Sequence, residues 1–136
     1  MVLGFRMIQY SVQLAAGDQS LQRDGISVYT AFPGRGAQDA FEYTCRALRD
    51  KRYCCDTTLH HPAAQTGQRG QFLFTIRLNE QSMVMTPANG LPRKSYFEAD
   101  RHSQDSREAE LKWRDEKINF ANTLLSLPPE ECLRVL

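Results

Sequence analysis

Two cysteines and two histidines lie close together in the chain, at Cys54, Cys55, His60 and His61. Thiolates and imidazoles are common zinc ligands, so this cluster raises the question of a metal site. A strand through this segment would point neighbouring residues to opposite faces, and the Cys-x-x-Cys spacing of a zinc site is absent. We therefore expect no metal and no cofactor, with Cys55 buried and the two histidines at a strand end.

A second chemical arrangement would use Cys45 as a nucleophile, with His60 or His61 as its base. Cys45 falls on the apolar side of an expected amphipathic helix. A thiol in that position is usually a small core residue without a lowered pKa. We therefore expect no catalytic residues and a chain that is not an enzyme.

Gly34-Arg35-Gly36 stands immediately before the same expected helix. Glycines at a helix start let backbone N–H groups approach an anion such as phosphate. The motif lacks the Walker spacing and the third glycine of a dinucleotide fingerprint. A simple turn that begins the helix is the favoured interpretation.

The segments that precede this motif show the period of strands. Residues 8–14 alternate apolar and polar side chains, with Ile8, Tyr10, Val12 and Leu14 on one side. After a loop at Gly17-Asp18, residues 26–30 alternate again until Pro33. This pattern predicts an N-terminal hairpin.

The middle of the chain predicts a helix followed by three strands. Apolar residues at helical spacing indicate a helix over residues 37–48. Alternation predicts strands over 53–59, 71–78 and 82–86, the last two joined by a short turn at 79–81. Phe72, Phe74, Ile76 and Leu78 would share the buried side of the second of these strands.

The last third predicts helices. Residues 93–101 follow Pro92, and residues 103–127 end at Pro128-Pro129, with a short helical turn expected over 130–136. Strands in consecutive hairpins pair antiparallel. The predicted fold class is therefore α+β, with an antiparallel sheet of three to five strands and helices packed on one face.

Length and charge limit the possible classes of protein. The 136 residues fit a single domain, divided into an N-terminal hairpin extension (1–36), an α-β-β-β-α core (37–104) and a C-terminal helical extension (105–136). No apolar run is long enough to span a membrane, and Arg6 interrupts the apolar start. Four cysteines in such a chain are expected to be reduced, which favours an intracellular location. With 17 Lys+Arg against 16 Asp+Glu, nucleic acid could be bound only through a local basic patch.

Residues 37–104 resemble a double-stranded RNA-binding domain. The resemblance lies in the order helix, three strands, helix, carried by AQDAFEYTCRALRD, YCCDTTLHH, HPAAQTGQRG, QFLFTIRLN, SMVMT and NGLPRKSYFEAD. The Gly-Pro-x-His loop of the family is absent, and its run of lysines is reduced to Arg93-Lys94. The resemblance implies a non-enzymatic module in a ribonucleoprotein or multi-protein assembly, with weak, shape-dependent binding of duplex RNA.

The resemblance also implies which residues would contact RNA. The first helix would present Gln38 and Glu42 to a minor groove, and the loop between the first two strands would present further polar groups. The implied contacts are Gln38, Glu42, His61, Gln68, Arg69, Arg93 and Lys94.

The alternative is a protein-interaction or scaffold subunit without nucleic-acid binding, with a ubiquitin-like or degenerate RNA-binding fold. Trp113 lies in a charged segment, so it either packs on the sheet or anchors a partner. The same two possibilities hold for Tyr96 and Phe97. Trp113, Tyr96 and Phe97 are thus the candidate partner-binding residues.

Overall fold

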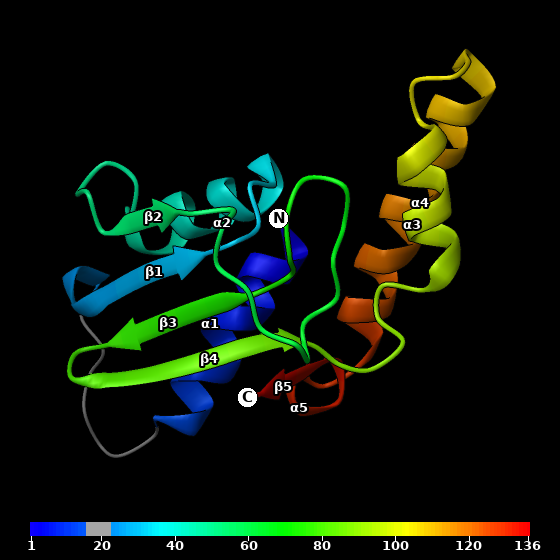
Figure 1. Cartoon of the computed structure of the whole chain (residues 1–136). Helices are drawn as coiled ribbons and strands as arrows, with labels where there is room; N and C mark the ends of the chain where they lie inside the picture. The colour runs from blue at the N-terminus through cyan, green and yellow to red at the C-terminus, as the bar shows by residue number, and fades with distance from the viewer. Residues whose placement is uncertain (16–22) are drawn as a thin grey trace.

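The computed structural model describes residues 1–15 and 23–136 (Figure 1). These residues form five α-helices, one short 3-10 helix and five strands. In chain order they are α1 (Val2–Leu14), η1 (Arg23–Gly25), β1 (Ile26–Thr30), α2 (Arg35–Cys45), β2 (Tyr53–Cys55), β3 (Phe74–Leu78), β4 (Gln81–Pro87), α3 (Lys94–His102), α4 (Arg107–Ser126), α5 (Pro129–Cys132) and β5 (Leu133–Val135). The α+β class is therefore confirmed.

The predicted N-terminal hairpin is wrong, because residues 2–14 form helix α1. The buried residues of this segment are Leu3, Gly4, Met7 and Ser11, whose spacing is that of one helix face. The four residues that alternate with period two are only half-buried or exposed. The ubiquitin-like grasp that this hairpin would have formed is therefore not present in residues 1–15 and 23–136. The predicted loop at Gly17-Asp18 lies outside the described residues.

The strands form one sheet in the order β2-β1-β3-β4-β5. Strand β3 pairs antiparallel with β1 on one side and with β4 on the other, and β4 pairs antiparallel with β5. The β3–β4 hairpin was predicted, and its turn is the pair Asn79-Glu80 between Leu78 and Gln81. The predicted face of β3 is also confirmed, since Phe72, Phe74, Ile76 and Leu78 are all buried.

The first strand of the expected three-strand core does not pair as predicted. Strand β2 pairs in parallel with β1, and β1 separates it from β3. Helix α2 is the crossover that this parallel pair requires. The strand is also shorter than expected, because the carboxylate of Asp56 accepts hydrogen bonds from the backbone N–H and hydroxyl of Thr58 and turns the chain.

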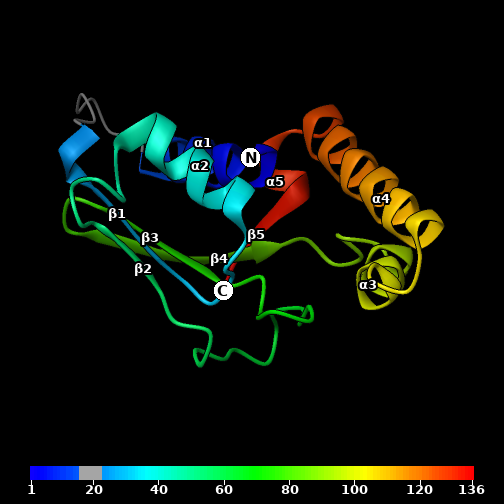
Figure 2. The ribbon, with the colours of Figure 1, turned by 90° about the horizontal axis from the view of Figure 1, so that it is seen from above.

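Helices α1 and α2 cover one face of the sheet, as Figure 2 shows. They approach closely because Gly4 on α1 faces Ala40 on α2. A Cβ on Gly4 would lie only 2.7 Å from the Cβ of Ala40. Between these helices and the sheet lies the core, whose largest fully buried side chains include Met7, Phe41, Phe72, Phe74 and Ile76.

Helices α3 and α4 pack against each other beyond the end of β4 (Figures 1 and 2). Arg6 of α1 holds the C-terminal end of α4. Its guanidinium donates to the carbonyl oxygens of Leu124, Leu125 and Leu127 at 2.8, 3.0 and 3.1 Å. These carbonyls have no partner within the helix, so a cation here satisfies them and complements the helix dipole.

Helix α4 is the longest of the described helices, and its first half is highly charged. Ser106 begins it by accepting a hydrogen bond from the backbone N–H of Ala109 at 3.1 Å. In residues 1–15 and 23–136, no helix combines the length and the apolar composition that crossing a membrane requires. After α4 the chain adds the short helix α5 and strand β5, the latter of which the sequence pattern did not predict.

Candidate ligand-binding pocket

A pocket of about 360 Å³ opens where the α3–α4 pair meets the rest of the molecule. Its walls come from six places: the start of α1, the start of α2 with the residues just before it, the 67–70 turn, Phe72 just before β3, one face of α3 and one face of α4. This volume falls in the range of small-molecule sites. The pocket therefore offers a concave site built from segments far apart in the sequence.

Five aromatic side chains line this pocket, and we call them the aromatic floor: Phe32, Phe72, Tyr96, Trp113 and Phe120. Phe32 stacks on Phe72 with ring centroids 4.3 Å apart, and Tyr96 meets Trp113 edge to face at 4.5 Å. Phe72 and Tyr96 are almost fully buried, at 1% and 8% exposure. The floor is thus an apolar surface of interlocking rings, in which Phe32, Trp113 and Phe120 are only half-buried.

Three cationic side chains surround the aromatic floor, and we call them the cationic rim: Arg35, Arg69 and Lys117. All three are exposed, and Lys117 lies over the Trp113 ring with its Nζ 5.2 Å from the centroid. The start of α2 is on the same wall, where Gly34, Arg35 and Gly36 line the pocket. No side chain caps this helix start, and the N–H of Ala37 donates to the Gly34 carbonyl at 3.0 Å.

Asp100 of α3 is the one acidic residue among those that line the pocket. Only 8% of Asp100 is exposed. Within the described parts of the chain, its carboxylate forms no hydrogen bond or ion pair. Burial, with the nearby Asp100 charge as a second cause, raises the pKa of Tyr96 above its usual value, while Arg69 opposes the shift. Asp100 thus supplies an acceptor on the pocket wall, near enough to Tyr96 for its charge to act on the hydroxyl.

The turn that carries Gln68 and Arg69 is held tightly in place. Thr66 and Gln71 form an isolated bridge, and the Gly67 N–H donates to the Gly70 carbonyl at 3.0 Å. Gly70 approaches the neighbouring backbone so closely that a Cβ there would lie 2.1 Å from the carbonyl oxygen of Ala31. Any larger residue would push the turn outward, so this glycine sets the position of Arg69 at the pocket.

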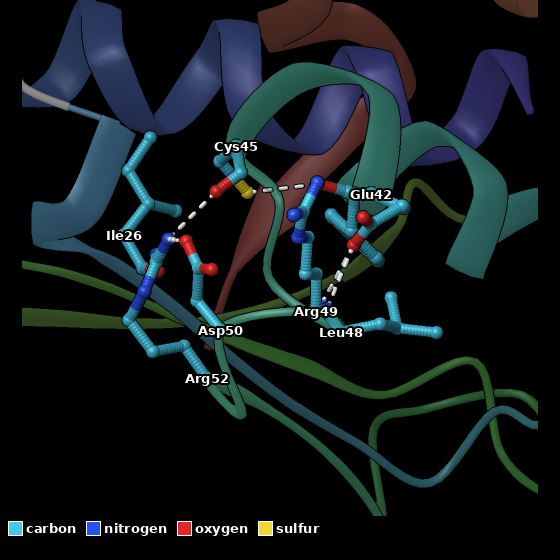
Figure 3. A network of polar contacts seen from close by, with 8 residues as sticks. Ile26, Glu42, Cys45, Leu48, Arg49, Asp50 and Arg52 are labelled. Carbon is cyan, nitrogen blue, oxygen red and sulfur yellow. Dashed lines mark hydrogen bonds and ion pairs between the residues drawn. The ribbon is translucent and has the colours of Figure 1, made fainter.

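Of the seven residues implied to contact RNA, Gln68 and Arg69 line the pocket. Glu42 instead stabilises the end of α2, where its carboxylate accepts hydrogen bonds from the backbone N–H groups of Leu48 and Arg49 at 3.0 and 3.1 Å. Figure 3 shows this arrangement beside Arg52, whose guanidinium donates to the Cys45 carbonyl at 2.7 Å. Gln38 is half-buried on α2 and does not line the pocket.

The other three implied contacts also lie outside the pocket. His61 belongs to the loop before β3. Its ring Nδ1 accepts a hydrogen bond from the backbone N–H of Ala63, and its backbone N–H donates to the side-chain oxygen of Gln71. Arg93 and Lys94 are exposed at the start of α3. Lys94 lies 3.8 Å from Glu98. The structure therefore does not gather the seven residues at one place.

The three candidate partner-binding aromatic residues do come together. Tyr96 and Trp113 belong to the aromatic floor. Phe97 packs behind them, with its ring centroid 5.9 Å from Phe72 and 5.5 Å from Tyr96. These rings join α3 and α4 to the sheet and at the same time leave one surface open to the pocket.

The four cysteines are free thiols. Cys45 is fully buried on α2, where its Sγ donates to the Phe41 carbonyl at 3.0 Å and burial raises its pKa. Its thiol has no hydrogen bond to His60 or His61 in the described residues. Cys54 is exposed and Cys55 half-buried. Across residues 1–15 and 23–136, no group of three or more His, Cys, Asp or Glu side chains is placed to hold a metal.

Several pocket residues were not predicted from the sequence, above all Arg35, Asp100 and Lys117. Part of the pocket could nevertheless have been recognised from the sequence. Trp113, Lys117, Phe120, Ala121 and Leu124 follow one face of α4, and Tyr96 and Asp100 are one turn apart on α3. No local pattern indicated that the start of α2 and the 67–70 turn would meet these faces.

Comparison with known proteins found no matching family model, no similar curated protein and no similar solved structure.

Proposed function

We propose that this chain is a non-enzymatic binding module whose pocket holds one nucleotide, and that its natural ligand is an unpaired nucleotide of RNA. The observation that supports this most directly is the combination of the aromatic floor with the cationic rim in one pocket. A nucleotide has the same two parts, a flat base and an anionic phosphate.

The aromatic floor supports the base half of the proposal. Stacking of a base on an aromatic side chain contributes about 1–3 kcal/mol and tolerates any base. Trp113 is half-buried, so part of its ring remains open to the pocket. Recognition of RNA commonly uses unpaired bases stacked on such rings.

The cationic rim and the start of α2 support the phosphate half. Arg35, Arg69 and Lys117 supply three positive charges against the single acid Asp100. Uncapped N–H groups at the start of an eleven-residue helix add a partial positive charge.

The same chemistry would be offered by a free nucleotide, by a single strand and by an end or bulge of a duplex. The sequence resemblance implied contact with duplex grooves, and this stays a prediction. A single pocket cannot admit a base that is paired and stacked within a helix. We therefore expect unpaired RNA to bind more tightly than a blunt duplex.

Fluorescence polarisation with labelled RNA tests the proposal. The ligands are a short single strand and a blunt duplex of about 16 base pairs, the length that a double-stranded RNA-binding domain spans. We expect the single strand to bind, nucleoside monophosphate to compete with it, and Arg69→Ala or Lys117→Ala to weaken it about tenfold. With three cations at the rim, the slope of log K against log salt should be about −2 or shallower.

Matched controls make this result specific. Lys112→Ala removes a lysine of α4 outside the pocket, and Arg101→Ala removes an exposed arginine of α3. Neither should change binding. Preferential binding of the duplex that Arg93→Ala with Lys94→Ala abolishes, and that Lys117→Ala leaves intact, would support the groove contacts and contradict the pocket.

A second candidate function is self-association through the outer face of α4. Leu111, Ile118 and Leu125 lie seven residues apart on this helix and are 41%, 50% and 59% exposed. The three positions are symmetric about Ile118. In an antiparallel pair of two copies, Ile118 would face itself, and Leu111 of each copy would face Leu125 of the other. The charged first half of each helix would then face the second half of its partner, in which Lys117 is the one charged residue.

Sedimentation equilibrium tests this second candidate. We expect a concentration-dependent dimer that Ile118→Lys abolishes, because two buried lysines would meet at the two-fold axis. The control is Asn119→Lys, which adds the same charge at the neighbouring exposed position. A monomer at all concentrations, or a dimer that Ile118→Lys leaves unchanged, would contradict it.

A further inference from the structure

Asp100 lines the pocket but takes no part in the base stacking or the phosphate contacts proposed above. Its residue surface is 92% buried, since 8% remains exposed, and no described side chain neutralises it. Its oxygens are not among the fully enclosed, unpaired polar atoms of the described residues, so they remain accessible and offer free acceptors to a group that enters the pocket. The placement of Asp100 on the pocket wall, rather than at the surface, therefore points to a ligand group that pairs with it.

The chemistry of that ligand group is restricted. An ionised carboxylate has only acceptors, so the ligand must offer N–H or O–H donors. A cationic ligand is disfavoured, because Arg35, Arg69 and Lys117 surround the same pocket. The remaining choice is a neutral edge with donors, carried by a molecule whose other end is an anion.

Among the four RNA bases, guanine alone has two adjacent N–H donors on its Watson–Crick edge, at N1 and N2. Adenine would place the N1 lone pair against the carboxylate, and cytosine would do the same with N3. Uracil offers one donor between two carbonyl oxygens. A carboxylate with two oxygens matches the guanine edge through two parallel hydrogen bonds.

We infer that Asp100 makes the pocket selective for guanine. This inference rests on the proposed nucleotide site and adds the base that the site prefers. The base would lie on the aromatic floor with its N1 and N2 donors on Asp100, and the phosphate would face the cationic rim. Asp100 lies one helical turn after Tyr96, at the edge of the aromatic floor. The hydrogen-bonding edge of a stacked base would reach its carboxylate there.

Isothermal titration calorimetry with four nucleoside monophosphates tests the inference. We expect guanosine monophosphate to bind about tenfold or more tightly than the adenosine and cytidine compounds. Inosine monophosphate, which lacks the N2 amino group, should lose about tenfold relative to guanosine monophosphate. Asp100→Asn should remove the guanine preference while adenosine monophosphate still binds, which shows that the variant is folded. Glu98→Gln, on the exposed side of α3, is the matched control and should retain the preference.

The outcomes separate the guanine preference from the nucleotide site itself. If all four compounds bind with similar affinity, or if Asp100→Asn keeps the preference for guanine, the inference is contradicted and the nucleotide site stands. If none of the four compounds binds, both the inference and the proposed function are contradicted.

Discussion

The rings of Tyr96 on α3 and Trp113 on α4 meet edge to face with their centroids 4.5 Å apart. Tyr96 also contacts Phe72, which lies just before β3, at 6.1 Å. One chain of aromatic contacts therefore connects the α3–α4 pair to the sheet. The same rings form the floor of the pocket, so the stability of this junction and the proposed binding depend on the same side chains.

Removing the indole should loosen this junction. We expect Trp113→Ala to lower the free energy of unfolding by about 2 kcal/mol, less than for a fully buried aromatic residue because Trp113 is half-buried. Urea denaturation followed by far-ultraviolet circular dichroism measures this. Lys112→Ala, at an exposed position of α4, should cost under about 0.5 kcal/mol. Equal losses in the two variants would show that the aromatic contact contributes no stability.

The hydrogen bonds that Arg6 donates to the end of α4 should make a measurable contribution to stability. Arg6→Met keeps the apolar stem but leaves three carbonyl oxygens without their donor. We expect a loss of about 2 kcal/mol in the free energy of unfolding, since hydrogen bonds to charged groups contribute about 1.5–3 kcal/mol. Arg101→Met, at an exposed position of α3, is the control. An unchanged thermal midpoint of unfolding for Arg6→Met would contradict a stabilising role of these hydrogen bonds.

Much of the local structure could be predicted from the sequence. The β3–β4 hairpin follows from the alternation at Phe72, Phe74 and Ile76 and from the short turn after it. Helix α2 was predicted because Pro33, Gly34 and Gly36 break the chain just before its apolar face. These features depend on residues that are close together in the sequence, so a local sequence pattern is enough to predict them.

The remaining errors have physical causes. In α1, apolar residues recur at every second position from Ile8 to Leu14, although the segment is a helix. Its buried face is set by packing on α2, where Gly4 meets Ala40. The parallel pairing of β1 with β2 depends on a crossover, which strand alternation does not encode. The pocket combines Arg35, Asp100 and Lys117 from three elements, and their meeting follows only from the tertiary arrangement.

The four thiols should differ sharply in reactivity. Cys54 is exposed, whereas Cys45 and Cys132 are buried and their pKa values are raised chiefly by burial. Burial also raises the pKa of the half-buried Cys55. Titration of the native protein with a thiol-specific disulfide reagent should therefore show one rapid reaction, which Cys54→Ser abolishes. Unfolding should release the other three. Rapid modification of Cys45 in the folded protein would be inconsistent with the structure.

Two tyrosines should make the protein sensitive to alkali. Burial raises the pKa of Tyr53 from 10.0 to about 12, and burial together with Asp100 raises the pKa of Tyr96 further. Above pH 10 the unfolded chain loses these protons while the folded chain keeps them. The free energy of unfolding should therefore be unaffected below pH 10 and fall as the pH rises from 10 towards 12.

Denaturation at a series of alkaline pH values measures this loss. Tyr53→Phe should flatten the decline between pH 10 and 12, because phenylalanine has no proton to release. Tyr43→Phe, at a residue that is 77% exposed, serves as the control and should leave the decline unchanged. A decline that is as steep in Tyr53→Phe as in the original protein would contradict the assignment.

The central claim is that the pocket between α2, the 67–70 turn and the α3–α4 pair holds a nucleotide. Trp113 is the only tryptophan of the chain and lies on the floor of that pocket, so its fluorescence reports directly on occupancy. Titration with guanosine monophosphate should quench this fluorescence in a saturable way, and Arg69→Ala should shift the midpoint about tenfold to higher concentration. Fluorescence that stays constant up to millimolar nucleotide, in protein shown to be folded, would contradict the claim.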